Sequence, residues 1–253
     1  MPERGKRIFI ATSGWHYGHW VGPFYPEGMS PGRFLEFYAS RFNTVEVNST
    51  FYGLPTEKAV RAWCDIVPAG FTFSIKASRL ITHNKKLTDP GLTLPRFFDS
   101  VNAFGKKAGP VLFQLPPRWK LNAPRLDSFL SSLPGGRRYA FEFRDASWFD
   151  EAVYGALSRH NAAFCIYDLD RSLSPKILTT DFAYIRLHGP DGKYRGRYGD
   201  AALKGWALEF ERWGVKEIYC YFDNDEAGYA ALNALRLKEM VEGRQPFARG
   251  NPR

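Results

Sequence analysis

One feature of this sequence constrains its fold more than any other: short apolar or β-branched runs recur along the whole chain, and each run ends in polar residues. Eight runs are evident, with helix-like sequence between most of them: IFIATSGW, TVEVNSTFY, FTFSIKAS, PVLFQLPP, YAFEFRDASW, AFCIYD, AYIRLHG and EIYCYFDND. Eight strands that alternate with helices predict an α/β fold, the (β/α)8 TIM barrel. In such a barrel the reacting groups lie at the carboxyl ends of the strands.

The length of the chain fits one barrel and no second domain. Its 253 residues are close to the roughly 250 that a TIM barrel needs. We expect a basic N-terminal segment at residues 1–7, the barrel at residues 8–242 and a disordered basic tail at residues 243–253. About a dozen residues separate the sixth and seventh runs, so the helix there should be short or missing. An open doubly wound sheet is the rival architecture, but no glycine-rich G-x-G-x-x-G turn follows the first run.

The charge of the chain does not by itself indicate a polyanionic partner. The net charge is +9, of which residues 1–7 supply +2 and residues 243–253 supply +3, which leaves +4 for the rest. Such a mildly basic body does not demand nucleic acid. No segment reaches the roughly 18 uncharged apolar residues of a membrane span, and no apolar signal region precedes the first run. We therefore expect a cytoplasmic protein that binds no membrane.

Alternation within the runs predicts which side chains point into the barrel. Successive residues of a strand face opposite sides of a sheet, and the apolar side should meet the helices. The polar side then belongs on the barrel axis. This interpretation places on the axis Thr44, Glu46, Asn48, Thr72, Ser74, Lys76, Gln114, Ala140, Glu142, Arg144, Tyr184, Arg186, His188, Tyr219, Tyr221 and Asp223. We therefore expect a ring of charged side chains at the barrel mouth.

Glu46 and Glu142 are the acidic residues most securely placed in this ring, with cationic side chains on neighbouring strands. Carboxylates beside cations in a partly closed cleft are a common means of acid/base catalysis. A structural ion network that fills the top of the barrel is the alternative, and the two can coexist. For Lys76 we expect an ion pair rather than a Schiff-base nucleophile, because a lysine among carboxylates keeps its proton.

Two other chemistries fit the pattern less well. Many barrel glycosidases place their carboxylates at the ends of the fourth and seventh strands, where this chain has Gln114 and Arg186. A divalent metal such as magnesium or manganese would find oxygen ligands at the mouth, yet the cations there compete for the same carboxylates. The cofactor therefore remains unknown, a divalent metal stays an alternative, and no metal ligand is assigned.

Anion recognition has better support. Lys76, Arg144 and Arg186, with the loop residues Arg195 and Arg197, can converge on a phosphate or carboxylate, which arginine holds through two donors. Aromatic residues in the loops after the first and seventh runs line the same cleft or simply pack over the barrel end. Two histidines belong to this region: His188 at the end of the seventh run is a candidate proton carrier, and His83 can reach the mouth from its loop.

The whole chain resembles the YecE-like family, also called domain of unknown function 72. The segments that carry the resemblance are SGWHYGHWVGPFYP, VEVNSTFY, FSIKASRLITH, LFQLPP, FEFRDASW, YIRLHG and YFDNDEAGYAALNA. The resemblance implies a TIM barrel and no settled reaction; the family's similarity in shape to abasic-site endonucleases suggests nucleic acid by fold analogy alone. The family pattern maps onto Gly14, Trp15, Glu46, Asn48, Tyr52, Lys76, His83, Gln114, Pro116, Glu142, Arg144, Trp148, Arg186, His188 and Gly189. Asp223 departs from the family, which commonly has asparagine there.

Together these observations predict an enzyme with acid/base or hydrolytic chemistry on a small polar, anionic molecule, such as a phosphorylated or sugar-like compound. Glu142 and Glu46 would be the acid/base pair and His188 a proton shuttle. The predicted binding residues are Lys76, Arg144, Arg186, Asn48, Gln114, Trp15, Tyr52, Trp148 and His83. A phosphodiesterase acting on nucleic acid, and a barrel that binds a metabolite or partner without catalysis, are the alternatives.

Overall fold

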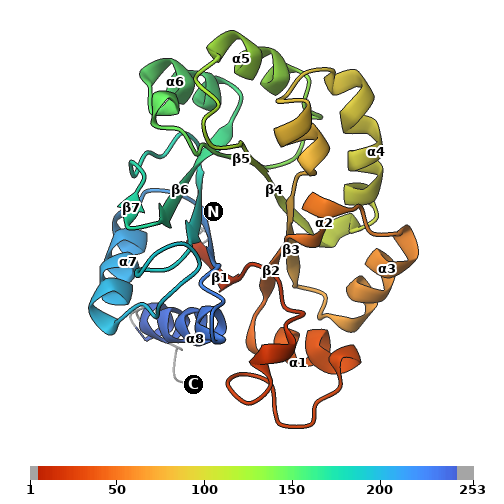
Figure 1. Ribbon diagram of the computed structural model, residues 1–253, viewed down its shortest axis with the longest axis vertical. Helices are drawn as coiled ribbons and strands as arrows, with labels where there is room; N and C mark the ends of the chain where they lie inside the picture. Colours follow the sequence, from red (N-terminus) through yellow and green to blue (C-terminus); the bar gives the residue numbers. More distant parts are fainter. Residues whose placement is uncertain (1–4, 244–253) are drawn as a thin grey trace, which may run out of the picture.

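Eight parallel strands form the wall of a nearly closed barrel in the computed structural model, which describes residues 5–243 (Figure 1). Around the barrel they follow the order β1-β9-β8-β6-β5-β4-β3-β2. Between β1 and β2 closure rests on a bridge of Ser13 with Glu46, and the amide of Gly14 donates to the Glu46 carbonyl at 2.8 Å. The strands are β1 (Arg7–Thr12), β2 (Thr44–Val47), β3 (Thr72–Lys76), β4 (Ala108–Gln114), β5 (Tyr139–Glu142), β6 (Ala162–Leu169), β8 (Phe182–Leu187) and β9 (Glu217–Phe222). The predicted TIM barrel is confirmed.

Helices surround the strands, as Figure 1 shows. Side-chain caps explain several of their starts: Thr56 accepts a hydrogen bond from the amide of Ala59 at 3.2 Å, and Asp150 accepts one from Ala152 at 2.8 Å. The helices are α1 (Phe34–Arg41), α2 (Ser49–Tyr52), α3 (Glu57–Ile66), α4 (Pro90–Asn102), α5 (Ala123–Ser131), α6 (Glu151–Arg159), α7 (Asp200–Arg212) and α8 (Tyr229–Glu242).

The connection between β6 and β8 departs from an ideal barrel in the way that the sequence predicts. A short strand, β7 (Ser172–Leu173), turns back and pairs antiparallel with the end of β6. Residues 174–181, all of which the structure describes, then run to β8 without a helix. The missing helix is therefore confirmed. Its absence leaves the hairpin of β6 and β7 at the carboxyl end of the barrel.

Side chains that alternate along the strands meet inside the barrel. The hydroxyl of Tyr221 lies 2.8 Å from Thr44 Oγ1 and 2.7 Å from Ser74 Oγ, so three strands join at one level of the axis. One level nearer the mouth, the hydroxyl of Tyr184 donates to Glu46 Oε2 at 2.7 Å. The inward projection predicted for these five residues is confirmed, and it brings polar side chains of distant strands within hydrogen-bond reach.

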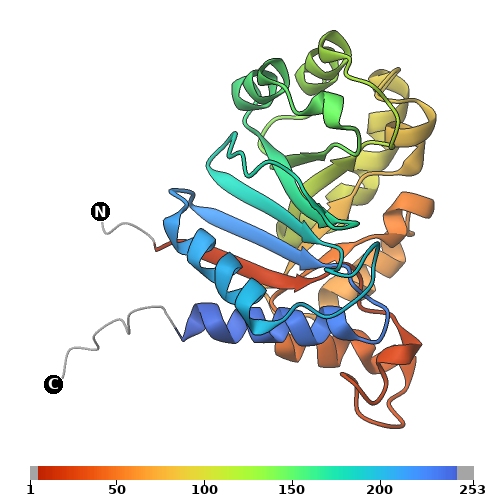
Figure 2. The same ribbon diagram turned by 60° about the vertical axis from the view of Figure 1, so that its left-hand side comes forward.

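The ends of the described chain lie away from the mouth. In Figure 2, β1 begins and α8 ends at the end of the barrel opposite the carboxyl ends of the strands. The predicted disordered tail, residues 243–253, lies outside the described residues apart from Gly243. Within residues 5–243, no helix combines the length and apolar character that crossing a membrane requires.

Candidate functional site

Arg186, from β8, is the centre of an ion network buried inside the barrel. Its Nη2 lies 2.7 Å from Glu46 Oε1, and its Nη1 lies 2.8 Å from Glu142 Oε2. Nη2 also lies 3.2 Å from Asp223 Oδ2. Glu46, Glu142 and Arg186 are at most 1% exposed, so water does not screen these contacts. The structure thus joins β2, β5, β8 and the end of β9 through one guanidinium.

Each of the two carboxylates has further donors. Glu46 accepts hydrogen bonds from the hydroxyls of Ser13 and Tyr184, and Glu142 accepts one from Arg144 Nε. Burial alone would raise the pKa of Glu142, but the charges of Arg144 and Arg186 hold that pKa well below its usual range. Glu142 is therefore ionised at neutral pH and is a weak base.

His188 lies in the same network and is fully buried. Its Nε2 is 3.1 Å from Arg144 Nη2, and because a guanidinium can only donate, Nε2 is the acceptor. Nδ1 lies 3.0 Å from Asp223 Oδ2, but it is not aligned for a hydrogen bond. Burial, and then the charges of Arg186 and Arg144, put the pKa of His188 well below its ordinary value, so the ring is neutral.

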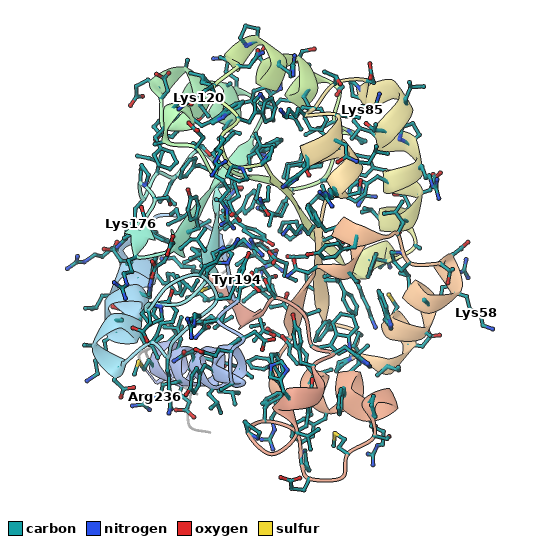
Figure 3. All side chains as sticks on the ribbon, in the orientation of Figure 1. Lys58, Lys85, Lys120, Lys176, Tyr194 and Arg236 are labelled. Atoms are coloured by element: carbon teal, nitrogen blue, oxygen red, sulfur yellow. The ribbon has the colours of Figure 1, made fainter. Side chains whose placement is uncertain are left out.

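A cavity of about 850 Å³ opens at the carboxyl ends of β3 to β6, beside this network. Four cationic side chains line it, against one carboxylate, Asp170. Tyr194 contributes an aromatic wall and lies toward the centre of the barrel in Figure 3, whereas the labelled basic residues lie on the periphery. The cationic residues of the lining are Lys76, Arg118, Arg144 and Lys193. Arg144 therefore belongs both to the cavity and to the buried network.

Lys76 faces the cavity without the ion pair that the sequence predicts, so that prediction is wrong. Among the described residues, no carboxylate oxygen lies within 4.0 Å of its Nζ, which instead lies 4.6 Å from the centre of the Phe51 ring. The guanidinium groups of Arg144 and Arg186 occupy the carboxylates, since their planar forks match carboxylate geometry better than an ammonium does. Burial, and then the charge of Arg186, lower the pKa of Lys76 to about 8.

His83 also lines this cavity, from a π-helical turn at Leu80–Asn84. Its ring packs edge-on against Phe51, with centroids 5.0 Å apart, and Nδ1 lies 2.9 Å from Thr82 Oγ1. Burial lowers the pKa of His83 to about 4, helped by the charge of Lys76, so the imidazole is neutral at pH 7. The Phe51 ring therefore contacts both the amine of Lys76 and the neutral imidazole of His83.

The remaining predicted site residues divide between this cavity and other places. Gln114 and Tyr52 line the cavity. Trp15 and Asn48 instead line a separate hollow of about 640 Å³ beside α3. Trp148 is 1% exposed, does not line the cavity and donates through Nε1 to the Trp119 carbonyl at 2.5 Å.

Sequence reasoning missed two cations of the cavity and chose the wrong residues of one loop. Arg118 follows the two prolines after β4, and Lys193 lies in the long loop after β8. The predicted Arg195 is exposed and lies 3.3 Å from Glu226, and neither it nor Arg197 lines the cavity. Position after the carboxyl end of a strand was the signal available for Arg118 and Lys193.

The described residues contain no group of three or more histidine, cysteine, aspartate or glutamate side chains arranged to hold a metal ion. Within the network, the carboxylates of Glu46 and Glu142 already accept hydrogen bonds from arginine. The arrangement is thus a cationic cavity above a buried network, and its chemistry suits an anion.

Comparison with known proteins places these residues in a family context. The family described as "Protein of unknown function DUF72" matches residues 9–253. The UPF0759 protein YunF of Bacillus subtilis is 26% identical over 271 residues, which cover 93% of this chain and 95% of that protein. The UPF0759 protein YecE of Escherichia coli K12 is 31% identical over 143 residues, which cover 56% of this chain and 50% of that protein.

Solved structures agree with the family match. A DUF72 family protein from Thermotoga maritima superimposes with a TM-score of 0.85 at 31% identity, over 93% of this chain and 99% of that one. A DUF72 family protein from Enterococcus faecalis gives a TM-score of 0.76 at 20% identity, over 94% and 98% of the two chains, and this second likeness speaks for the fold alone.

Proposed function

This chain belongs to the DUF72 family of proteins of unknown function. We propose that it is an enzyme that binds a small polar anion in its mouth cavity and catalyses proton transfer to or from that molecule. The substrate class is a phosphorylated or sugar-like molecule. The observation that carries the proposal is the charge of the cavity lining. The cavity has a volume of about 850 Å³, and its lining contains one acidic residue and four cationic residues: Lys76, Arg118, Arg144 and Lys193. A cavity of this size suits a small-molecule substrate.

Arg144 is the central anion-binding group of this proposal. Its Nε is held by Glu142 and its Nη2 by His188, and among the described residues no acceptor is bound to Nη1. The guanidinium carbon also lies 5.1 Å from the centre of the Tyr167 ring. A guanidinium fixed in this way loses little entropy when it binds an anion, which favours affinity.

Glu142, Glu46 and His188 act in this proposal as positioning residues. All three are buried, none lines the cavity, and Glu142 is too weak a base to take a proton readily. Their hydrogen bonds hold Arg144 and Arg186 in place instead. Proton transfer falls to groups that face the cavity, namely Lys76, with a pKa of about 8, and the neutral His83.

A ligand panel tests the anion site. Phosphorylated sugars and small carboxylic acids, each paired with its uncharged parent, are compared by thermal shift and calorimetry. We expect the charged members to bind and Arg118→Gln/Lys193→Gln to weaken them about tenfold or more, since a hydrogen bond to a charged group contributes roughly 1.5–3 kcal/mol. Lys58→Gln/Lys204→Gln, which removes two exposed charges outside the cavity, is the matched control.

Two outcomes contradict the proposal. Equal binding of the charged and uncharged partners, or an equal loss in both double variants, would mean that the cavity charges do not select the ligand. The phosphodiesterase alternative predicts a different result, namely binding to double-stranded DNA that weakens with salt. The logarithm of the binding constant should fall linearly with the logarithm of the salt concentration, with a slope of about −0.9 for each phosphate contacted. Tight metabolite binding without turnover would favour the non-enzymatic alternative.

A further inference from the structure

We propose that Lys76 forms an imine with its substrate, so that the anionic ligand of the mouth cavity is an aldehyde or a ketone. This inference rests on the proposed anion site and adds to it the functional group that reacts. Its basis is the position of the amine: Nζ faces the cavity at the carboxyl end of β3, has no carboxylate partner among the described residues, and is surrounded by groups that bind anions.

The missing ion pair is the decisive observation. A lysine whose Nζ is held by a carboxylate remains an ammonium and is a poor nucleophile. Here the carboxylates of Glu46 and Glu142 are bound to arginines. These carboxylates and Asp223 raise the pKa of Lys76 from a distance, but burial and the like charge of Arg186 outweigh them. The phenyl face of Phe51 contacts Nζ but accepts no proton from it. The lowered pKa, about 8, agrees with this arrangement and makes part of the amine available at neutral pH.

The reaction balances with groups that are present. The unprotonated nitrogen of Lys76 attacks the carbonyl carbon, a C–N bond forms, and the carbonyl oxygen takes up a proton. The nitrogen next gives up one proton, and the hydroxyl oxygen gains one. The C–O bond then breaks, the nitrogen lone pair forms the C=N bond, and one water leaves. Lysine ammonium and carbonyl compound together yield an iminium ion and water, so no oxidant or reductant is needed. His83, neutral and packed on the same Phe51 ring, is placed to relay this proton from nitrogen to oxygen, since a neutral imidazole accepts at one ring nitrogen and donates from the other.

The iminium ion specifies the class of chemistry that follows. A positively charged nitrogen draws electrons from the neighbouring carbon atoms, which makes proton removal or carbon–carbon cleavage next to the imine easier. Arg144, Arg118 and Lys193 would hold the anionic end of the same molecule. The site therefore fits an isomerase or lyase of phosphorylated or carboxylated carbonyl compounds.

Pyridoxal 5′-phosphate is a suitable probe because it carries both an aldehyde and a phosphate. The intact protein is incubated with the probe at pH 7.5, reduced with sodium borohydride, digested and mapped by mass spectrometry. We expect Lys76 to be labelled at least about tenfold more than exposed lysines such as Lys58, since an amine of pKa about 8 is unprotonated on the order of a hundredfold more often than an ordinary lysine. Inorganic phosphate should protect it.

Lys76→Arg is the matched variant, because it keeps the positive charge but cannot form an imine. We expect it to retain phosphate binding and to lose the cavity adduct, with an unchanged circular dichroism spectrum. Labelling spread over surface lysines, with Lys76 unmodified while phosphate still binds, would overturn the imine and leave the anion site standing. Failure of phosphate and of the probe to bind at all would overturn both.

Discussion

Arg144 Nη2 lies 3.1 Å from His188 Nε2, and this contact joins the open cavity to the buried network. The neutral imidazole accepts, so the arginine keeps a second fixed partner besides Glu142. Two buried side chains, Glu142 and His188, thereby orient the cationic side chain of Arg144 at the mouth of the barrel. The buried network and the cationic lining of the cavity are therefore parts of one connected arrangement.

The buried network predicts a large effect of Arg186→Met on stability. The variant leaves Glu46 and Glu142 buried without their shared guanidinium, and breaking such a buried pair costs about 3–5 kcal/mol of unfolding free energy. Urea unfolding at pH 7 measures it. Arg195→Met, which removes an exposed guanidinium, should change the value by no more than about 0.5 kcal/mol. Similar values for the two variants would contradict the network.

The lowered pKa of Glu142 predicts how stability falls in acid. Because the folded pKa lies below the ordinary value of 4.5, the carboxylate contributes stability that is fully present above that value and is lost as pH falls toward the folded pKa. The difference in unfolding free energy between the wild-type protein and Glu142→Gln should therefore shrink below pH 4.5. Parallel curves for the two proteins from pH 7 to pH 3 would show that the shift is absent.

The lowered pKa of Lys76 predicts a trend of the same sign at alkaline pH. Its pKa falls from 10.5 to about 8 on folding, so between these values the unfolded chain binds more protons than the folded one. The stability of the wild-type protein relative to Lys76→Met should consequently rise with pH across this window. Unfolding free energies of both proteins at pH 7 and pH 9.5 test the sign, and a flat or falling difference would mean that Lys76 keeps its ordinary pKa.

Trp148 predicts a change in stability without a change in binding. Trp148→Phe keeps most of the packing against Phe143 but leaves the Trp119 carbonyl without its donor, which should cost about 1–3 kcal/mol. Because Trp148 does not line the cavity, the affinity for phosphate should stay unchanged. A clear loss of affinity in a folded Trp148→Phe protein would instead support the binding role that the sequence predicts.

Strand periodicity made the barrel and its interior predictable from the sequence. Glu46, Glu142 and Arg186 could be placed on one axis because strand side chains alternate, and this rule needs no tertiary information. The rule fails where the strand ends. Asn48 already has a helical backbone at the start of α2, so it no longer follows the alternation.

Pairing and loop geometry could not be predicted in the same way. Which cation binds Glu142 depends on distances across the barrel, and these favour Arg186 and Arg144 over Lys76. In the loop after β8, alternation has no fixed period, so nothing in the sequence distinguished Lys193, which faces the cavity, from Arg195, which pairs with Glu226. Loops thus supplied the residues that sequence reasoning misplaced.

A crystal structure of the protein soaked in inorganic phosphate tests the central claim most directly. We predict phosphate density inside the mouth cavity, within hydrogen-bond distance of Arg144 and beside Arg118 or Lys193. An empty cavity at a phosphate concentration that fills other surface sites would contradict the assignment of this cavity as the anion-binding site.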